Sequence, residues 1–271
     1  MAFRSADINV MAGAAYRAAR RLVRDFGEVE QLQVSKKGPA DFVTNADLMA
    51  EKTILRELQH ARPAYGLLME EKGAIKGEDP DCRWVVDPLD GTTNFLHGIP
   101  HFAISIALEV RGEITAGIVY QPLTDELYWA EKGRGAHVND RRLRVSARRE
   151  FRDAVIATGI PHLGRGSADE FSHLLRVVMA EVAGVRRFGA ASLDLAYVAA
   201  GRFDGFWETG LERWDIAAGS LIVREAGGFV SDINGGEGYM KSGDIVAAND
   251  PLHPKLTKLL NGTRRDYRSK A

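Results

Sequence analysis

The sequence is poor in the features that mark secreted, membrane-spanning or nucleic-acid-binding chains. Cys82 is the single cysteine among 271 residues. It excludes an intramolecular disulfide and a cysteine metal cluster, and favours a reducing compartment such as the cytoplasm. The formal net charge is -1, from 36 Lys and Arg against 37 Asp and Glu, so no electrostatic reason exists to expect a nucleic-acid binder. Internal repeats and low-complexity tracts are also missing from the sequence.

A long hydrophobic run is missing from the N-terminal region as well. Apolar residues recur there at helical spacing, but arginines interrupt them at positions 17, 20 and 21. This pattern predicts an amphipathic helix that packs on a core, rather than a signal peptide or a membrane span. We therefore expect a cytoplasmic protein without a membrane partner. The apolar positions of this helix are Ile8, Met11, Ala15, Ala19, Leu22 and Phe26.

The first half of the chain continues with a second predicted helix over about 48–61, which Pro63 ends. Several short strand-like runs follow, and the middle three are expected to be joined by tight connections such as 111–112. This spacing predicts an antiparallel sheet with helices on one side. The runs lie at 65–70, 83–87, 101–110, 113–122 and 126–132.

Helix and strand patterns alternate from about residue 153 onward, which predicts an α/β second half. We place the boundary in the polar, basic segment 145–152. The predicted domains are an N-terminal α+β half at 1–148, which carries most metal ligands, and a C-terminal α/β half at 149–271, which completes the site. The chain should end in a helix near 252–261 and a solvated, frayed tail. The other segments are strand-like at 154–159 and helical at 169–183.

The segment DPLDGTTNF at 87–95 places two acids three residues apart, directly after an apolar strand. Pro88 restricts the backbone, so the carboxylates of Asp87 and Asp90 and the Leu89 carbonyl could converge on one point. Ligands that are all oxygen favour a hard ion such as Mg²⁺ over zinc. The alternative is an Asx-turn in which an acid caps a following helix. Both interpretations can hold together.

Three further features are ambiguous by themselves. If a helix begins at Gly91 and Thr92, its free N–H groups make a seat for a phosphate. The pair Glu70–Glu71 ends a strand-like run, and an ordinary exposed pair is the usual interpretation of such residues. Glu208 and Asp215 lie seven residues apart, and Asp215 is equally suited to capping a helix.

Together these segments resemble the inositol monophosphatase family. The likeness rests on EE at 70–71, DPLDGTTNF at 87–95 and WDIAAG at 214–219, in this order. It extends to DFVTNAD at 41–47 and to residues 186–208, and it is strongest toward the bacterial SuhB-type branch. The resemblance implies a layered αβαβα sandwich with a mostly antiparallel N-terminal sheet and a mixed C-terminal sheet.

The resemblance also implies a magnesium-dependent phosphomonoesterase with two to three ions and inhibition by Li⁺. Thr92 would help to activate the attacking water and bind phosphate, Asp47 would accept a hydrogen bond from Thr92, and Glu70 would orient the water. The implied metal site consists of Glu70, Asp87, the Leu89 carbonyl, Asp90, Thr92 and Asp215. The implied substrate contacts are Asp90, Gly91, Thr92, Gly189, Ala191, Glu208 and Asp215.

Phosphate-monoester hydrolysis is extremely slow without a catalyst, and paired Mg²⁺ ions can supply both a strong nucleophile and compensation for the charge on the leaving oxygen. The substrate expected first is myo-inositol 1-phosphate. Fructose 1,6-bisphosphate, histidinol phosphate and 3'-phosphoadenosine 5'-phosphate are the alternatives. The resemblance further implies a homodimer, and it leaves open a regulatory role in which the chain binds RNA polymerase or antitermination factors.

Overall fold

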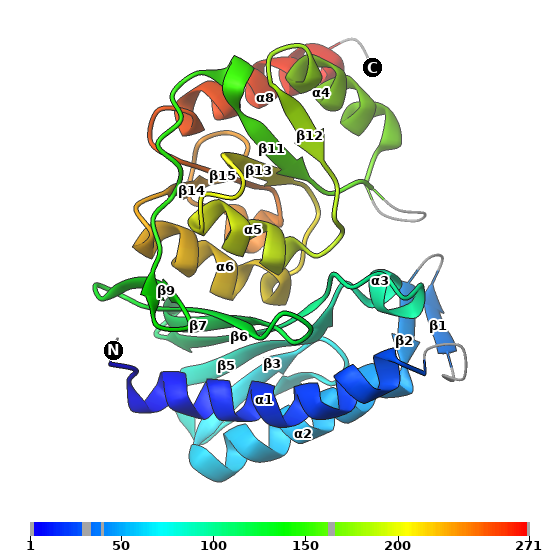
Figure 1. Ribbon diagram of the computed structural model, residues 1–271, viewed down its shortest axis with the longest axis vertical. Helices are drawn as coiled ribbons and strands as arrows, with labels where there is room; N and C mark the ends of the chain where they lie inside the picture. Colours follow the sequence, from blue (N-terminus) through cyan, green and yellow to red (C-terminus); the bar gives the residue numbers. More distant parts are fainter. Residues whose placement is uncertain (1–2, 29–33, 39–40, 162–165, 270–271) are drawn as a thin grey trace.

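The computed structural model describes residues 3–28, 34–38, 41–161 and 166–269, with the backbone alone for 34–38 and 41–44. Its helices and sheets form the predicted αβαβα sandwich (Figure 1). One outer layer consists of α1 (Ala6–Phe26) and α2 (Asn45–Ala61), which pack on each other. The middle layer is α5 (Ala191–Ala199) with α6 (Arg213–Glu225), and the other outer layer is α4 (Ala168–Met179) with α8 (His253–Arg268).

The first sheet is mostly antiparallel, as predicted. Its eight described strands lie in the order β10-β9-β8-β7-β6-β5-β3-β4, and the parallel pair is β3–β5. All five predicted strand runs are confirmed. The strands are β3 (Tyr65–Met69), β4 (Gly73–Ile75), β5 (Asp79–Asp90), β6 (Ala103–Val110), β7 (Glu113–Gln121), β8 (Glu126–Glu131), β9 (Gly135–Val138) and β10 (Arg141–Arg142).

The predicted tight connections hold at one place and fail at another. Arg111 and Gly112 join β6 to β7 with positive φ angles of 52° and 82°, the backbone of a two-residue hairpin turn. The connection from β5 to β6 is longer, because the short helix α3 (Thr92–Leu96) lies in it. The prediction of a tight turn there was wrong, since the turn residues of DGTTN begin a helix instead.

Helices cover both faces of this sheet, so the expectation of helices on one side was also wrong. α1 packs on β6 and β7, and α6 packs on the same two strands from the opposite face (Figure 1). The burial of β6 explains the difference: seven consecutive residues from Ala103 are buried. A strand with one wet face would alternate, whereas a strand covered on both faces is apolar throughout.

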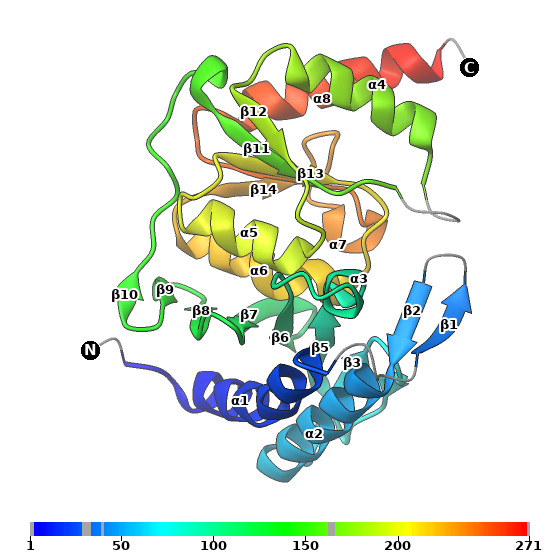
Figure 2. The same cartoon turned by 45° about the vertical axis from the view of Figure 1, so that its right-hand side comes forward.

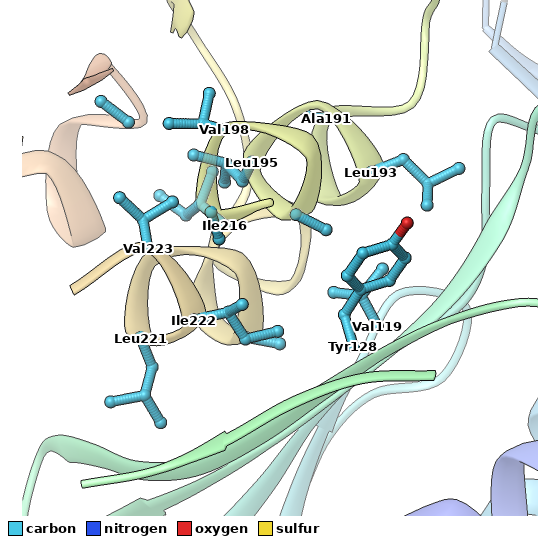
Figure 3. Packing of buried hydrophobic residues seen from close by; sticks show 14 of the residues in the cluster. Val119, Tyr128, Ala191, Leu193, Leu195, Val198, Ile216, Leu221, Ile222 and Val223 are labelled. Atoms are coloured by element: carbon cyan, nitrogen blue, oxygen red, sulfur yellow. The ribbon is translucent and has the colours of Figure 1, made fainter. Parts of the chain in front are cut away.

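The two helices of the middle layer, α5 and α6, contribute to the largest apolar cluster among the described residues. Figure 3 shows side chains of α5 and α6, among them Leu193 and Ile222, facing Val119 and Tyr128 of the first sheet. Eight of the nine residues of α5 are buried. α6 approaches the sheet closely because Gly117 has no side chain; a Cβ there would lie 3.0 Å from the Cα of Ala218.

The second sheet is mixed, also as predicted, with its five described strands in the order β12-β11-β13-β15-β14. β11 is parallel to both of its neighbours, while β15 is antiparallel to β13 and β14. Its strands are β11 (Val155–Thr158), β12 (Gly184–Arg186), β13 (Gly205–Glu208), β14 (Phe229–Ser231) and β15 (Ile245–Ala248). The remaining elements are the hairpin β1 (Val34–Gly38) and β2 (Asp41–Thr44), η2 (Phe151–Asp153) and α7 (Tyr239–Ser242).

Three helix ends depart from the prediction. α2 begins at Asn45, three residues before the predicted start, and α4 ends at Met179 rather than 183. α8 continues to Arg268, so the tail predicted to be frayed is helical over most of its length. Arg264 and Arg268 each form an ion pair with Glu170 of α4, at 2.7 and 3.0 Å. No helix in the described ranges has the length and apolarity needed to cross a membrane.

Candidate active site

A bulge at the end of β5 places Asp87 and Asp90 on the same face of the sheet. Asp87 lies opposite Ser105 and Asp90 lies opposite Ala103, so three steps on β5 match two on β6. Ser105 and Ala103 lie two residues apart on β6 and therefore share a face of the sheet. Their partners Asp87 and Asp90 share that face too. Pro88 occupies the bulge, where its missing N–H costs no ladder hydrogen bond. This agrees with the predicted convergence of the two carboxylates.

Glu70 lies beside this pair because β3 runs parallel to β5. Met69 is level with Val86, and the Glu70 N–H donates to the Val86 carbonyl at 3.3 Å. Glu70 and Asp87, the next residue of each chain segment, therefore lie side by side at the C-terminal ends of the paired stretches of β3 and β5. Both Glu70 and Glu71 are half-buried, so the interpretation as an exposed surface pair does not hold.

Asp215 reaches the same place from the first turn of α6. Its Oδ2 accepts the Glu212 N–H at 2.8 Å, and the Glu212 side chain completes a capping box. The predicted capping role is therefore confirmed. Burial raises the pKa of Asp215 well above its ordinary value, and the charge of Asp90 raises it further.

Asp90 does not cap the following helix, so that alternative was wrong. The N-cap of α3 is Gly91, at a φ of 94° that favours glycine. The Asp90 carboxylate turns to α5 instead, where Oδ2 accepts the Ser192 N–H at 2.8 Å and the Ser192 hydroxyl at 2.5 Å. Ser192, which sequence reasoning missed, thereby fixes the carboxylate across the two halves of the chain.

Thr92 and Asp47 meet as predicted. The Thr92 Oγ1 lies 3.1 Å from Asp47 Oδ1 and 3.0 Å from the Leu89 carbonyl oxygen. One hydroxyl proton can serve one of these acceptors at a time. Asp47 is fully buried in the first turn of α2, so its carboxylate is held in place by the packing of that helix.

Of the other predicted substrate residues, Glu208 belongs to a second acidic group, together with Asp194. Glu208 ends β13 beside a cavity of about 40 Å³. Burial raises the pKa of Glu208 to about 8, and the charge of Asp90 contributes. Gly159 makes room for this carboxyl group, since a Cβ there would lie 1.9 Å from Glu208 Oε1. Gly189 precedes the N-terminus of α5 and Ala191 is its first residue.

Asp194 belongs to this second group and was missed from the sequence. It is buried on α5, and its Oδ1 has no hydrogen-bond partner among the described residues. Burial raises its pKa well above the ordinary value; Glu208 and Asp90 raise it further, while Arg187 opposes them. The only signal for Asp194 in the sequence was its position inside the segment SLDLAYVAAG, where an acid breaks an apolar helix.

The acids of the site raise one another's pKa, but their side chains are not close enough to coordinate one metal ion as they stand. Burial raises the pKa of Asp87 well above its ordinary value, followed by the charges of Glu70, Asp90 and Asp215. Within the described ranges, however, no three acid, histidine or cysteine side chains are close enough to hold a metal ion as they stand. Charges interact over several ångström, whereas a metal bond needs about 2 Å, so carboxylates that share a region satisfy both observations.

The donor set nevertheless fits a hard divalent cation. Buried carboxylates that raise one another's pKa carry negative charge that a cation would neutralise. One oxygen each of Asp87 and Asp215 accepts a backbone N–H at 2.9 and 2.8 Å, which orients these groups. All groups concerned are oxygen donors, the type that Mg²⁺ prefers.

The chain belongs to the inositol monophosphatase family, whose model matches residues 4–269. It is 62% identical over 255 residues to an inositol-1-monophosphatase of Mesorhizobium japonicum, covering 94% of this chain and 96% of the relative. It is 43% identical to the Nus factor SuhB of Escherichia coli strain K12, covering 97% of each. The crystal structure of the suppressor protein SuhB from Bartonella henselae superposes with a TM-score of 0.92 at 60% identity, covering 94% of this chain and 98% of that one.

Proposed function

We propose that this chain is an inositol-1-monophosphatase, which hydrolyses myo-inositol 1-phosphate to myo-inositol and phosphate. The observation that carries the proposal is the meeting of Asp87, Asp90 and Asp215 from two distant segments, beside Glu70 and the Thr92–Asp47 pair. The name of the Mesorhizobium relative supports the substrate. The buried carboxyl groups on the alcohol side favour a neutral polyol over a second phosphate, because burial disfavours charge there and a hydroxyl group can exchange hydrogen bonds with these groups.

The carboxylates of the site would hold the magnesium ions. Glu70, Asp87 and the Leu89 carbonyl would bind one ion, while Asp87, Asp90 and Asp215 would bind a second. The Leu89 carbonyl oxygen is available as a ligand when the Thr92 hydroxyl donates its proton to Asp47 instead. Bound Mg²⁺ would lower the pKa of water and offset the charge on the phosphate oxygens. Li⁺ is expected to inhibit by competing for one of these positions.

The residues around Thr92 would orient the attacking water. When Thr92 donates its proton to Asp47, its Oγ1 lone pair is left to accept a hydrogen bond from that water. Glu70 would take the water proton as the oxygen attacks phosphorus and the bond to the inositol oxygen breaks. The leaving oxygen then takes up a proton from solvent, so the atoms balance without a phosphoenzyme.

The substrate would lie between the short helix α3 and the start of α5. The N–H groups of Gly91 and Thr92 would bind phosphate, and Gly189, Ala191 and Asp90 would border the polyol. Glu208 has a pKa of about 8, so its carboxyl group keeps a proton at neutral pH and can donate a hydrogen bond to a hydroxyl group.

Phosphate release from a panel of substrates tests the proposal. The panel consists of myo-inositol 1-phosphate, fructose 1,6-bisphosphate, histidinol phosphate and 3'-phosphoadenosine 5'-phosphate, each with Mg²⁺ and with a chelator. We expect the highest kcat/KM for the inositol ester and no turnover with the chelator. Activity that survives the chelator would contradict the magnesium mechanism, and a preference for another ester would change the substrate.

A regulatory role is the second candidate, because an Escherichia coli relative that covers 97% of the chain is named Nus factor SuhB. We propose a cytoplasmic homodimer in either case, which sedimentation should show as twice the chain mass. The Asp87→Asn variant separates the two functions. It should lose turnover and still capture RNA polymerase or antitermination factors if the regulatory role exists; loss of capture with an intact fold would tie any such role to the metal site.

A further inference from the structure

An ion pair outside the acid cluster joins the start of α6 to the first sheet. Glu109 of β6 is buried, and its Oε2 accepts the Arg213 Nε–H at 2.9 Å and an Arg213 Nη2–H at 2.5 Å. The same carboxylate pairs with Arg83 of β5, its register partner, at 3.0 Å. Glu109 thus has two cations, and the contact with Arg213 spans 104 residues of sequence.

A second contact fixes the next residue of α6. The Ser105 hydroxyl donates to the Trp214 carbonyl at 3.2 Å, and Ser105 is the register partner of Asp87. Ser105 and Glu109 lie four residues apart on β6 and therefore share one face. The first two residues of α6 are consequently held at two points along one strand, and Asp215 follows them directly.

We propose that the Arg213–Glu109 pair is a positioning device for the metal site, which sets the Asp215 carboxylate at the level of Asp87. The proposal rests on the proposed function, in which Asp215 is a ligand. One hydrogen bond from Ser105 leaves the helix start free to rotate about that contact, whereas two contacts along the strand fix its direction. Arginine suits this task because its planar group donates two hydrogen bonds in a fixed geometry.

The metal alone provides the direct test, through Mn²⁺ binding to the full-length protein measured by electron paramagnetic resonance of the free ion. Arg213→Met keeps the aliphatic stem and removes the pair. We expect its Kd for Mn²⁺ to rise about tenfold, as observed when groups that orient ligands are lost. Its apparent activation constant for Mg²⁺ should rise by the same factor, while kcat at saturating Mg²⁺ stays near the wild-type value.

Arg202 offers a matched control, since it pairs with Glu126 and likewise joins the C-terminal half to the first sheet. Its segment does not lead into a proposed ligand. Arg202→Met should therefore leave Mn²⁺ affinity within twofold of the wild type. Arg213→Lys, which keeps the charge without the two-pronged geometry, should fall between the wild type and Arg213→Met.

The partner residue supplies an independent arm. Glu109→Gln should weaken Mn²⁺ binding in the same direction, and adding Arg213→Lys to it should cost less than the sum of the single effects, because both act through one contact. If Arg213→Met fails to fold, this pair of milder variants carries the test.

Three results would overturn the proposal, and the third differs from the first two. If the wild type binds Mn²⁺ and the Kd is unchanged in Arg213→Met, Arg213→Lys and Glu109→Gln, the positioning role is wrong but the proposed function stands. Equal weakening in Arg202→Met and Arg213→Met also removes it, since the effect is then general to such ion pairs. A wild-type protein that binds no Mn²⁺ overturns the proposed function and the positioning role with it.

Discussion

Two buried aspartates of this protein have opposite surroundings. Asp204 accepts the Val155 N–H at 2.7 Å, the Ser146 hydroxyl at 2.5 Å and the Arg148 guanidinium at 3.2 Å. Asp87 accepts one backbone N–H and otherwise faces Glu70, Asp90 and Asp215. The two carboxylates are equally buried, but only that of Asp204 is compensated by several hydrogen-bond donors and a cation. A compensated carboxylate links segments of the fold, whereas a carboxylate among carboxylates costs stability and prepares a place for a cation.

The largest expected effect comes from Asp87→Asn. Turnover should fall about 10³-fold, because Asp87 is proposed as a direct metal ligand and such a ligand contributes several kcal/mol of transition-state stabilisation. Without metal the same variant should melt at a higher temperature than the wild type. Burial and neighbouring acids raise the pKa of Asp87, and an amide removes that cost. Phosphate release with Mg²⁺ measures the first effect, and thermal denaturation in a chelator measures the second. Retained turnover would contradict the proposed role of Asp87 as a metal ligand.

Asp204→Asn is the matched substitution and should act in the reverse manner. It exchanges a charge that holds three donors for an amide, so we expect a loss of about 3 kcal/mol in the free energy of unfolding. Urea denaturation measures this loss. The kcat of the protein that remains folded should stay unchanged, and a large fall in kcat would mean that Asp204 also serves the site.

A smaller effect is expected at the Thr92–Asp47 contact. Asp47→Asn and Thr92→Val should each lower kcat between about 10-fold and 100-fold, in the range for residues that orient a reacting group. Thr92→Ser keeps the hydroxyl group and is the control. The double variant should be little worse than the worse single one. Additive losses would show that the two residues act separately.

The smallest effect concerns Glu208 and pH. Its folded pKa is raised from 4.5 to about 8, so its contribution to stability is complete below pH 4.5 and is lost as pH rises through 8. Glu208→Gln removes this loss. In a chelator, the difference between the melting temperature of the variant and that of the wild type should increase by a few degrees from pH 5 to pH 9. An unchanged difference across that range would show that Glu208 titrates normally.

The sequence predicted the parts of the site that depend on short stretches of chain. Asp87 and Asp90 share one bulge, so their neighbourhood follows from their spacing and from Pro88. Resemblance to the family brought Glu70, Asp47 and Asp215 to the same place. The strand runs and the layered fold were likewise readable, because each strand and helix carries its own apolar pattern.

Tertiary packing alone decided the contacts that support those residues. Ser192 holds Asp90 from 102 residues away, and Arg213 holds Glu109 from 104. A charged residue in a sequence does not reveal whether it is buried, or what it will face there. The pairing of β3 with β5 and the docking of α6 on β6 provide that information, because they bring distant backbones into register. Local spacing thus predicted the neighbourhood of Asp87 and Asp90, and the packing of the layers determined how the distant acids lie around them and how they are held.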